Sequence, residues 1–286
     1  MPVTTTGILT LSCPDRPGLV HAVSGFLVGV PANIVESHQF EDPRHGRFFM
    51  RIRFDLLEAG VSVAEVRDGF EPVAVEHAMA WNIVDAETPT RTLILVSKLG
   101  HCLNDLLFRA RTGSLNIDVP AVVSNHDDLR RHVESAGIAF HHVPVTTATK
   151  SEAENTLLEL VRNLDVDLVV LARYMQVLSD DACSALAGRA INIHHSFLPS
   201  FVGAKPYHQA HDRGVKLIGA TAHYVTAELD EGPIIEQDVA RVDHSMDAAA
   251  LAAAGHDVEA HVLARAVKWH SEHRVLLNGN RTVVVR

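Results

Sequence analysis

Along the first part of the chain, short apolar runs and helix-like spacings of apolar residues follow one another in the order β-α-β-β-α-β. The apolar runs predict strands at residues 7–14, 33–39, 47–54 and 79–84. Apolar residues at helical spacing predict helices from Leu19 to Leu27 and from Val63 to Phe70. This order is that of a ferredoxin-like unit, so we predict a small N-terminal domain at residues 1–86.

From residue 87 onward, apolar runs alternate with longer helical patterns. The runs predict strands at residues 92–97, 117–124, 140–143, 168–171 and 190–194. The helical patterns lie at residues 102–112, 127–136, 151–164, 180–187 and 246–273. This alternation predicts a doubly wound, mostly parallel α/β sheet in a second domain at residues 87–286. Residues 281–285 predict a small edge strand.

Composition limits the classes of function. The formal net charge is −10 and the pI is about 6.0, which argue against nucleic acid or an anionic membrane as a partner. The cysteines, Cys13, Cys102 and Cys183, are widely spaced and fit a reducing compartment without disulfides. The N-terminus lacks a signal peptide, and no apolar run approaches the ~18 residues of a membrane span. We therefore expect a cytoplasmic protein.

The most informative residues lie on the predicted strand 190–194 and at Asp230. Asn192 and His194 are two apart, so their side chains point to the same face of the sheet. At the carboxyl end of such a strand they lie where open α/β sheets bind ligands. An amide, an imidazole and a carboxylate are the groups needed to attack an acyl or formyl carbon. His195 should point the other way, and for it a structural and a catalytic role both stay open.

Three motifs carry a resemblance to the folate-dependent formyltransferases: Asn-x-His-x-Ser-x-Leu-Pro from Asn192, His223-Tyr224-Val225, and Asp230-x-Gly232-Pro233. His195 and the segments 203–210 and 214–224 are similar to the hydrolytic branch of that fold, the formyltetrahydrofolate deformylases. The resemblance covers nearly the whole chain. It implies hydrolysis of 10-formyltetrahydrofolate to tetrahydrofolate and formate by Asn192, His194 and Asp230, with no tightly bound cofactor and no metal.

The same resemblance implies where the folate binds. The loop after the predicted strand 168–171 would cradle the pterin ring, and its residues are Arg173, Tyr174, Met175, Gln176, Val177 and Leu178. His223 is also implied as a substrate-binding residue. A loop after the catalytic motif would form the rim of the pocket through Lys205, Tyr207, His208 and His211, with Lys205 near the glutamate tail of the folate.

The first turn of the N-terminal domain resembles that of an ACT domain, a ferredoxin-like module that senses small molecules. The residues that carry this resemblance are Asp15, Arg16, Pro17 and Gly18. Gly18 allows a tight approach, and Pro17 is a rigid start to a helix. The chain departs from the ACT pattern at Pro31-Ala32, where a glycine is usual. The resemblance implies an amino-acid effector site at a dimer interface, and a homodimer or homotetramer.

Three other functions remain open. A phosphoribosylglycinamide-type formyltransferase would pass the formyl group to a ribonucleotide, whose phosphate its relatives hold with a glycine-rich turn. The corresponding turn here, Ser97–Asp105, has one glycine and the bulky Leu99 and His101, which favours water as the acceptor. A folate or amino-acid sensor would not need the three catalytic groups. A metal site is not favoured, because His208-x-x-His211 has no further ligand at a recognised interval.

Overall fold

The computed structural model of the chain describes residues 5–58, 60–198 and 206–286. The chain divides into two compact units. The first comprises Met1–Pro89, Glu272–Asn278 and Val283–Arg286, and the second Thr90–Ser271 and Gly279–Thr282. The return of C-terminal residues to the first unit was not predicted from the sequence pattern.

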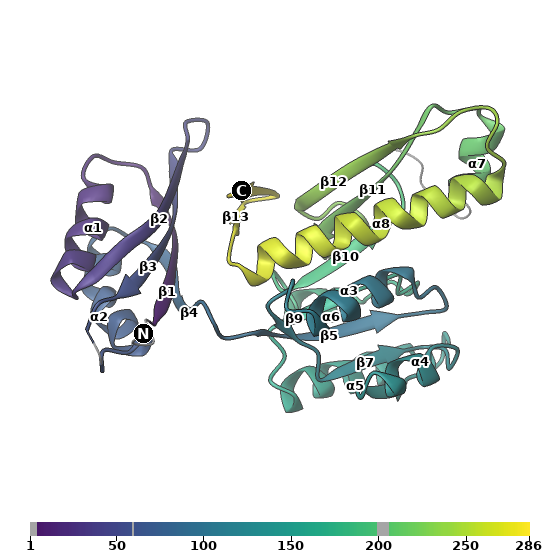
Figure 1. Cartoon of the computed structure of the whole chain (residues 1–286), viewed down its shortest axis with the longest axis horizontal. Helices are drawn as coiled ribbons and strands as arrows, with labels where there is room; N and C mark the ends of the chain where they lie inside the picture. Colours follow the sequence, from purple (N-terminus) through teal and green to yellow (C-terminus); the bar gives the residue numbers. More distant parts are fainter. Residues whose placement is uncertain (1–4, 59, 199–205) are drawn as a thin grey trace. The chain divides into compact units, whose positions relative to one another are not determined.

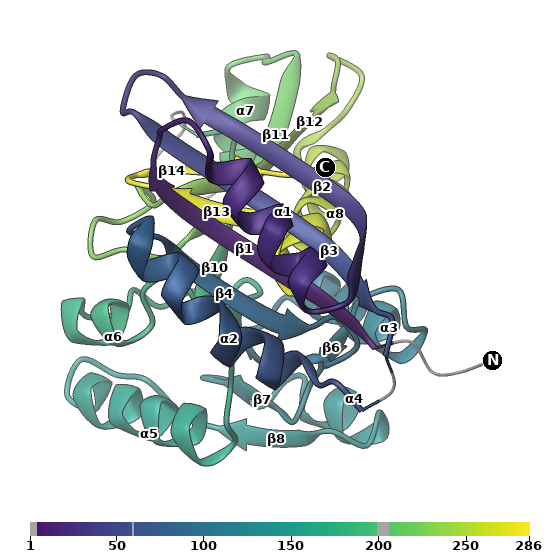
Figure 2. The same ribbon diagram turned by 90° about the vertical axis from the view of Figure 1, so that its left-hand side faces the viewer.

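The first unit is an antiparallel sheet with two helices on one face, both of which face the viewer in Figure 2. Its N-terminal elements are β1 (Thr6–Pro14), α1 (Leu19–Gly29), β2 (Ala32–Asp42), β3 (Arg47–Leu56), α2 (Val63–Glu76) and β4 (Ala80–Asp85). The strands lie in the order β2-β3-β1-β4, and every neighbouring pair is antiparallel. Leu11, Leu27 and Phe70, from β1, α1 and α2, are among the buried residues of the core between sheet and helices. The element order is the one predicted, although α2 continues six residues beyond Phe70.

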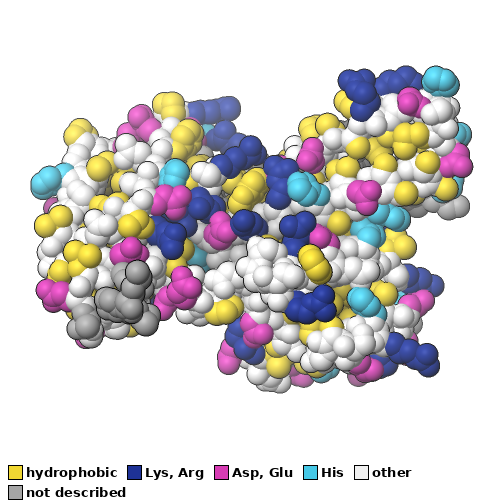
Figure 3. All heavy atoms as spheres, in the orientation of Figure 1, with side chains coloured by type: hydrophobic (Ala, Val, Ile, Leu, Met, Phe, Trp, Pro, Cys, Tyr) yellow, Lys and Arg dark blue, Asp and Glu magenta, His cyan; other side chains and the backbone are white. Residues whose placement is uncertain are grey.

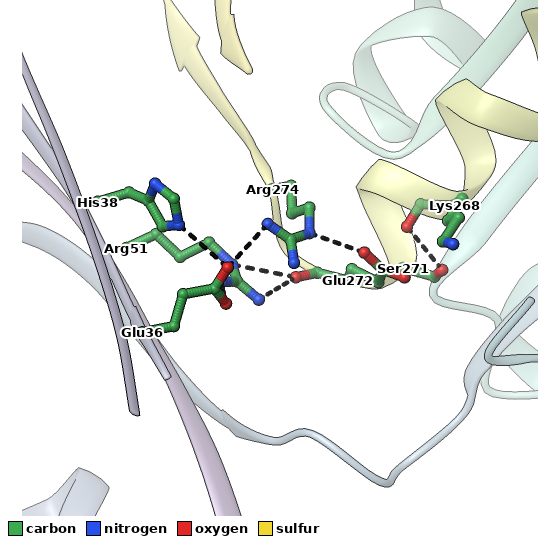
Figure 4. A network of polar contacts seen from close by, with 7 residues as sticks. All are labelled: Glu36, His38, Arg51, Lys268, Ser271, Glu272 and Arg274. Carbon is green, nitrogen blue, oxygen red and sulfur yellow. Dashed lines mark hydrogen bonds and ion pairs between the residues drawn. The ribbon is translucent and has the colours of Figure 1, made fainter. Parts of the chain in front are cut away.

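The C-terminal segment of the first unit is held by a buried arginine on β3 (Figure 4). Only 2% of the Arg51 surface is exposed, although an arginine is rarely buried unless it is paired. Its Nη1 donates to Glu36 Oε2 at 2.7 Å, and its Nε and Nη2 donate to the carbonyl oxygen of Glu272 at 3.3 and 3.0 Å. Arg274 contacts the other oxygen of Glu36 at 3.3 Å. The buried charge is thereby paired, and the segment after residue 271 is fixed to the sheet.

The second unit is built on a seven-strand path with four parallel pairings and two antiparallel ones (Figure 1). Along the path the order is β12-β11-β10-β9-β5-β7-β8, and β6 pairs with β5 off the path. The strands are β5 (Thr90–Val96), β6 (Ile117–Asp118), β7 (Ala121–Ser124), β8 (Ala139–His142), β9 (Leu168–Leu171), β10 (Ala190–His194), β11 (Leu217–Tyr224) and β12 (Ile234–Arg241). The mostly parallel α/β sheet is therefore confirmed, with β11 and β12 as an antiparallel addition.

The helices of the second unit largely follow the predicted pattern. They are α3 (His101–Arg111), α4 (Arg130–Ser135), α5 (Lys150–Asn163), α6 (Asp180–Ala185), α7 (Pro206–Asp212) and α8 (Ala248–Ser271). Helix α8 is 24 residues long and packs against α3 and against strands β10 to β12. None of the helices in the described part of the chain is long and apolar enough to cross a membrane.

Three sequence predictions need correction. The single strand predicted at 117–124 is two strands, because Pro120 between them has no N–H for the sheet ladder. The strand predicted at 281–285, β14 (Arg281–Val284), pairs with β13 (Val275–Asn278) in a separate hairpin rather than at an edge of the main sheet. The residues after Lys205, predicted as a loop, form α7.

Charged side chains are mixed on the surface. On the face seen in Figure 3, Lys and Arg side chains are interspersed with Asp and Glu side chains in each unit. Together with the net charge of −10, this distribution differs from the clustered basic surface that is typical of nucleic-acid-binding proteins.

Candidate active site

The site is built at the carboxyl end of β10. Asn192 and His194 lie on one face of this strand, and the antiparallel register with β11 places Asn192 opposite His223 and His194 opposite Thr221. Directly opposed residues on a sheet face are in contact range. The sheet itself therefore brings one amide and two imidazoles together. Asn192 and His194 share a face of the strand, as the alternation of side chains predicted from the sequence.

The third group, Asp230, comes from the turn between β11 and β12. Its backbone has φ of +59°, in the left-handed region that non-glycine residues seldom adopt. Gly232 explains part of this turn: a Cβ atom there would lie 1.8 Å from the carbonyl oxygen of Tyr224. Only glycine allows this close approach. The Asp-x-Gly spacing thus serves to place the Asp230 carboxylate over the end of the sheet.

The Asp230 carboxylate lies between the two histidines. Its Oδ2 is 3.2 Å from His194 Nδ1, and its Oδ1 is 3.7 Å from His223 Nε2. The hydrogen bond with His194, followed by the nearby His223, holds the pKa of Asp230 well below its ordinary range, although burial acts to raise it. The carboxylate is therefore ionised at neutral pH and is able to stabilise a positive charge on His194.

Hydrogen bonding leaves one nitrogen of His194 available for chemistry. Because Nδ1 faces the carboxylate, it carries a proton, and within the described part of the chain the buried Nε2 has no hydrogen-bond partner. His223 is oriented differently: its Nδ1 donates to the Tyr224 carbonyl at 2.9 Å, so its Nε2 accepts from Asn192 Nδ2 at 3.2 Å. His223 thus orients the Asn192 amide, and His194 presents a free imidazole nitrogen.

These groups line a cavity of about 300 Å³. Asn192, His194 and Asp230 are among its lining residues. The loop after β9 lines the same cavity through Arg173, Tyr174, Met175, Gln176, Val177 and Leu178, and the cavity also includes His195 and His223. All six loop residues predicted to contact the substrate, together with the three predicted catalytic residues, are therefore brought to one pocket.

The loop after β9 is anchored to the end of β5 by a buried serine. Ser97 Oγ accepts from the backbone N–H of Met175 at 3.0 Å and donates to Asn125 Oδ1 at 2.7 Å. The Met175 and Val177 side chains remain 58% and 54% exposed. A rigid backbone with exposed apolar side chains is suited to holding a flat aromatic ligand.

His195 does not point away from the site, contrary to the strand alternation. β10 ends at His194, so the alternation no longer applies to the next residue. The imidazole rings of His194 and His195 are stacked, with centroids 4.9 Å apart and planes 18° apart. Beyond it, Thr221 fixes the chain by donating to the Ser196 carbonyl and accepting from the Leu198 N–H.

Of the predicted rim residues, none that the structure describes lines the cavity, namely Tyr207, His208 and His211. Lys205 lies outside the described residues. Tyr207 is buried in a core with Ala210, Ile218 and Leu251, where its hydroxyl donates to Glu259, and it is not among the residues that line the cavity. Tyr207 was predicted to lie in a loop at the pocket rim. The chain instead forms α7 there, and Tyr207 lies on the buried face of this helix.

A buried carboxylate near the cavity was missed in the sequence. Glu259 on α8 is fully buried and contacts His101 Nε2 at 2.7 Å, Arg173 Nε at 3.4 Å and the Tyr207 hydroxyl. The sequence contains one indication of this burial: Glu259 is a charged residue at helical spacing from Gly255, Val262, Leu263 and Ala266, which are buried.

His101, Cys102 and Glu259 are close enough to act as metal ligands, but their environment is unfavourable for a cation. The positively charged Arg173 already lies beside the carboxylate.

A second cavity lies in the first unit. Asp15, Arg16, Pro17 and Gly18 line an open cavity of about 600 Å³ together with residues of α1 and Phe48. Gly18 has φ of +97° and directly precedes α1, so it allows the sharp entry into the helix. Arg16 donates to the Glu76 carbonyl at 2.7 Å and contacts His77, which ties the turn to the end of α2.

Comparison with known proteins gives one consistent result. Residues 90–267 match the family model described as formyl transferase. A formyltetrahydrofolate deformylase of Corynebacterium sp. (strain P-1) is 54% identical over 98% of both chains. The crystal structure of a formyltetrahydrofolate deformylase from Burkholderia mallei has a TM-score of 0.94 at 52% identity and covers 99% of this chain and 100% of its own. A glycinamide ribonucleotide transformylase from Symbiobacterium toebii covers 72% of this chain, with a TM-score of 0.65 at 31% identity.

Proposed function

Since the chain belongs to the formyltetrahydrofolate deformylase family, we infer that its cavity hydrolyses 10-formyltetrahydrofolate to tetrahydrofolate and formate. One observation supports this most strongly at the level of the site. The Asn192, His194 and Asp230 side chains line one cavity together with the loop Arg173–Leu178, and His194 Nε2 has no hydrogen-bond partner among the residues that the structure describes.

We propose that His194 Nε2 accepts a proton from water as the water oxygen adds to the formyl carbon. Asp230 stabilises the resulting imidazolium through Nδ1, at the observed 3.2 Å. The Asn192 amide, oriented by His223, donates to the oxyanion of the tetrahedral intermediate. The carbon–N10 bond then breaks, N10 takes the proton from His194, and formic acid leaves and ionises to formate.

The folate would lie with its pterin ring against the loop after β9. Backbone groups from Met175 to Leu178 are proposed to bind the polar edge of the ring, and exposed apolar side chains of the loop to cover its face. This places N10 and the formyl group toward the end of β10. Lys205 remains a proposed contact of the glutamate tail.

The direct test is release of formate from 10-formyltetrahydrofolate by the purified protein, with and without glycinamide ribonucleotide. We expect formate release at the same rate in both cases. Formyl transfer that requires the ribonucleotide would identify a transferase. If neither reaction occurred while folate still bound, a folate sensor would be the better description.

We also propose that the cavity at Asp15–Gly18 binds a small amino acid, in the manner of an ACT domain. A free amino acid carries one ammonium and one carboxylate, and this cavity offers the Asp15 carboxylate, the Arg16 guanidinium and the first turn of α1. The effector site is distinct in sequence from every residue placed in catalysis.

Asp15→Asn is expected to abolish any response of formate release to amino acids while leaving the rate without effector unchanged. The reason is that the variant loses the partner of the ammonium group and disturbs no catalytic residue. The measurement is a titration of the wild type and the variant with a panel of amino acids, with Asp68→Asn on the exposed surface of α2 as a control. A response retained in Asp15→Asn would place the effector elsewhere.

A homodimer or homotetramer in the cytoplasm is the assembly we propose. β2 is an edge strand of the first unit, and its Ile34, Val35 and Phe40 side chains are 36%, 48% and 47% exposed. An open sheet edge with exposed apolar residues favours pairing with a second copy.

A further inference from the structure

The loop after β9 begins with a strained residue that the end of β5 holds in place. Arg173 has φ of +66°, in the left-handed region that residues other than glycine seldom adopt. Such a conformation costs free energy and persists only where the surroundings fix it. Here the backbone N–H of the buried Ser97 donates to the Arg173 carbonyl at 3.3 Å, and the Ser97 hydroxyl accepts from the N–H of Met175 at 3.0 Å. One residue therefore holds the backbone on both sides of Tyr174.

The other end of the loop is held by a carboxylate of α5. Glu154 Oε1 accepts from the backbone N–H of Ser179 at 2.9 Å. Ser179 is the N-cap of α6, and its hydroxyl accepts from the N–H of Ala182. The Glu154 side chain is only 13% exposed, so its bond to the backbone lies in surroundings where hydrogen bonds are stronger than in water. Side chains from two different elements thus fix the loop at Met175 and at Ser179.

Between these two points the loop carries three consecutive backbone N–H groups that are open to a ligand. Those of Gln176, Val177 and Leu178 have no hydrogen-bond partner within residues 5–58, 60–198 and 206–286. Backbone donors are nearly always paired, so a run of unpaired ones is satisfied by water or by a ligand. All three residues line the cavity that contains the catalytic groups. A ligand with acceptors along one edge can bind this run only if the loop keeps its shape.

We propose that Ser97 and Glu154 are positioning residues for the folate, which hold the two ends of the loop so that its open N–H groups stay in place for the pterin edge. Neither residue is among those that line the cavity, so each acts through the loop and not by contact with the substrate. The catalytic groups are held separately, by the pairing of β10 with β11 and by the turn at Asp230. Loss of an anchor should therefore weaken folate binding and leave the chemical step largely unchanged. This inference rests on the proposed function and names what maintains its binding loop.

The test compares Ser97→Ala and Glu154→Ala with the wild type. Each variant is expected to raise KM for 10-formyltetrahydrofolate and Kd for tetrahydrofolate by about 3–10-fold, the effect of one lost hydrogen bond. The value of kcat should change by less than about twofold, because the catalytic groups do not depend on the loop. Formate release measures KM and kcat, and calorimetric titration with tetrahydrofolate measures Kd.

Thr92→Val and Glu159→Ala are the matched controls. Thr92 lies buried on β5 like Ser97, but its hydroxyl donates within its own strand, to the Thr90 carbonyl at 3.0 Å, and Glu159 is exposed on α5. Both controls should leave KM and Kd unchanged, even where Tm falls. Glu154→Gln keeps an oxygen acceptor at the same position and should restore a KM close to that of the wild type. A lower Tm with unchanged KM in Ser97→Ala and Glu154→Ala would show a merely structural role and overturn the proposal.

Should Ser97→Ala not fold, Asn125→Ala takes its place. Asn125 Oδ1 accepts from the Ser97 hydroxyl at 2.7 Å, so its loss frees that hydroxyl to rotate; a smaller rise in KM is expected, and no rise would count against the proposal. Glu154→Leu, which keeps most of the packing of the side chain, serves in the same way for the other anchor. If the wild type released no formate, the proposed function would fail, and the Kd values for tetrahydrofolate would still decide this inference. An active wild type whose anchor variants keep its KM and Kd would refute this inference alone.

Discussion

Replacing Asp230 by asparagine is expected to lower the turnover of 10-formyltetrahydrofolate by about 10³–10⁴-fold while folate still binds. The carboxylate faces His194 Nδ1 at 3.2 Å, so it fixes the proton on that nitrogen and stabilises the imidazolium formed during attack. An amide of the same shape carries no charge and can donate to Nδ1, which would direct the proton to Nε2, where the lone pair is needed. The loss should therefore appear in kcat and not in folate affinity.

The neighbouring residue provides the control for this variant. Glu231→Gln removes a carboxylate from the same turn at an exposed position and should leave turnover close to that of the wild type. His194→Ala should lose most turnover as well. Because the pKa of Asp230 lies well below its ordinary value, its charge persists as the pH falls through 4 and is lost only at more acidic pH. Near-normal turnover in Asp230→Asn or His194→Ala would contradict the proposed mechanism.

Arg51→Leu is expected to lower the free energy of unfolding of the first unit by about 3–5 kcal/mol. The substitution leaves Glu36 without its 2.7 Å partner and the carbonyl of Glu272 without two donors. Urea denaturation measures the loss, and hydrogen exchange should show β13 opening before β1 and β3. Arg53→Leu, two residues along the same strand but exposed, is the matched control and should change stability little.

The same network also predicts how the stability of the first unit depends on pH. Burial acts to raise the pKa of Glu36, but bonds from Arg51 and His38 lower it to about 2. The stability that Glu36 contributes is therefore complete above its unfolded pKa of about 4.3 and is lost as the pH falls toward 2. Equal losses of stability in Arg51→Leu and Arg53→Leu would show that the buried network is not the cause.

Much of the fold follows from local pattern because its elements are short and amphipathic or strongly apolar. The strand at Leu168–Leu171 was predicted with its observed bounds since all four residues are apolar and buried. β11 and β12 were not predicted, although Leu217–Tyr224 is largely apolar. β11 pairs antiparallel with β10, and β12 pairs antiparallel with β11, so these two strands break the alternation of strands and helices by which the other strands were predicted.

The site residues also differ in whether local sequence pattern or tertiary packing determines their positions. Asn192 and His194 were predictable because two residues on one strand share a face, and Asp230 because its turn carries a recognisable motif. His195 was predicted to face away because the alternation of side chains was extended one residue beyond the strand predicted at 190–194, which ends at His194 as observed. Tyr207 and Glu259 are 52 residues apart in sequence, and their pairing depends on how α7 and α8 pack, which no local pattern encodes.

At the end of helix α8 the chain passes from the second unit back into the first. The helix ends at Ser271 in the second unit, and the next residue, Glu272, belongs to the first unit, where its carbonyl accepts from Arg51. A truncation at residue 89 would therefore separate the sheet of β1 to β4 from the C-terminal segment that Arg51 holds. In a fragment that ends there, Arg51 is expected to lack the carbonyl partner that it has in the full chain.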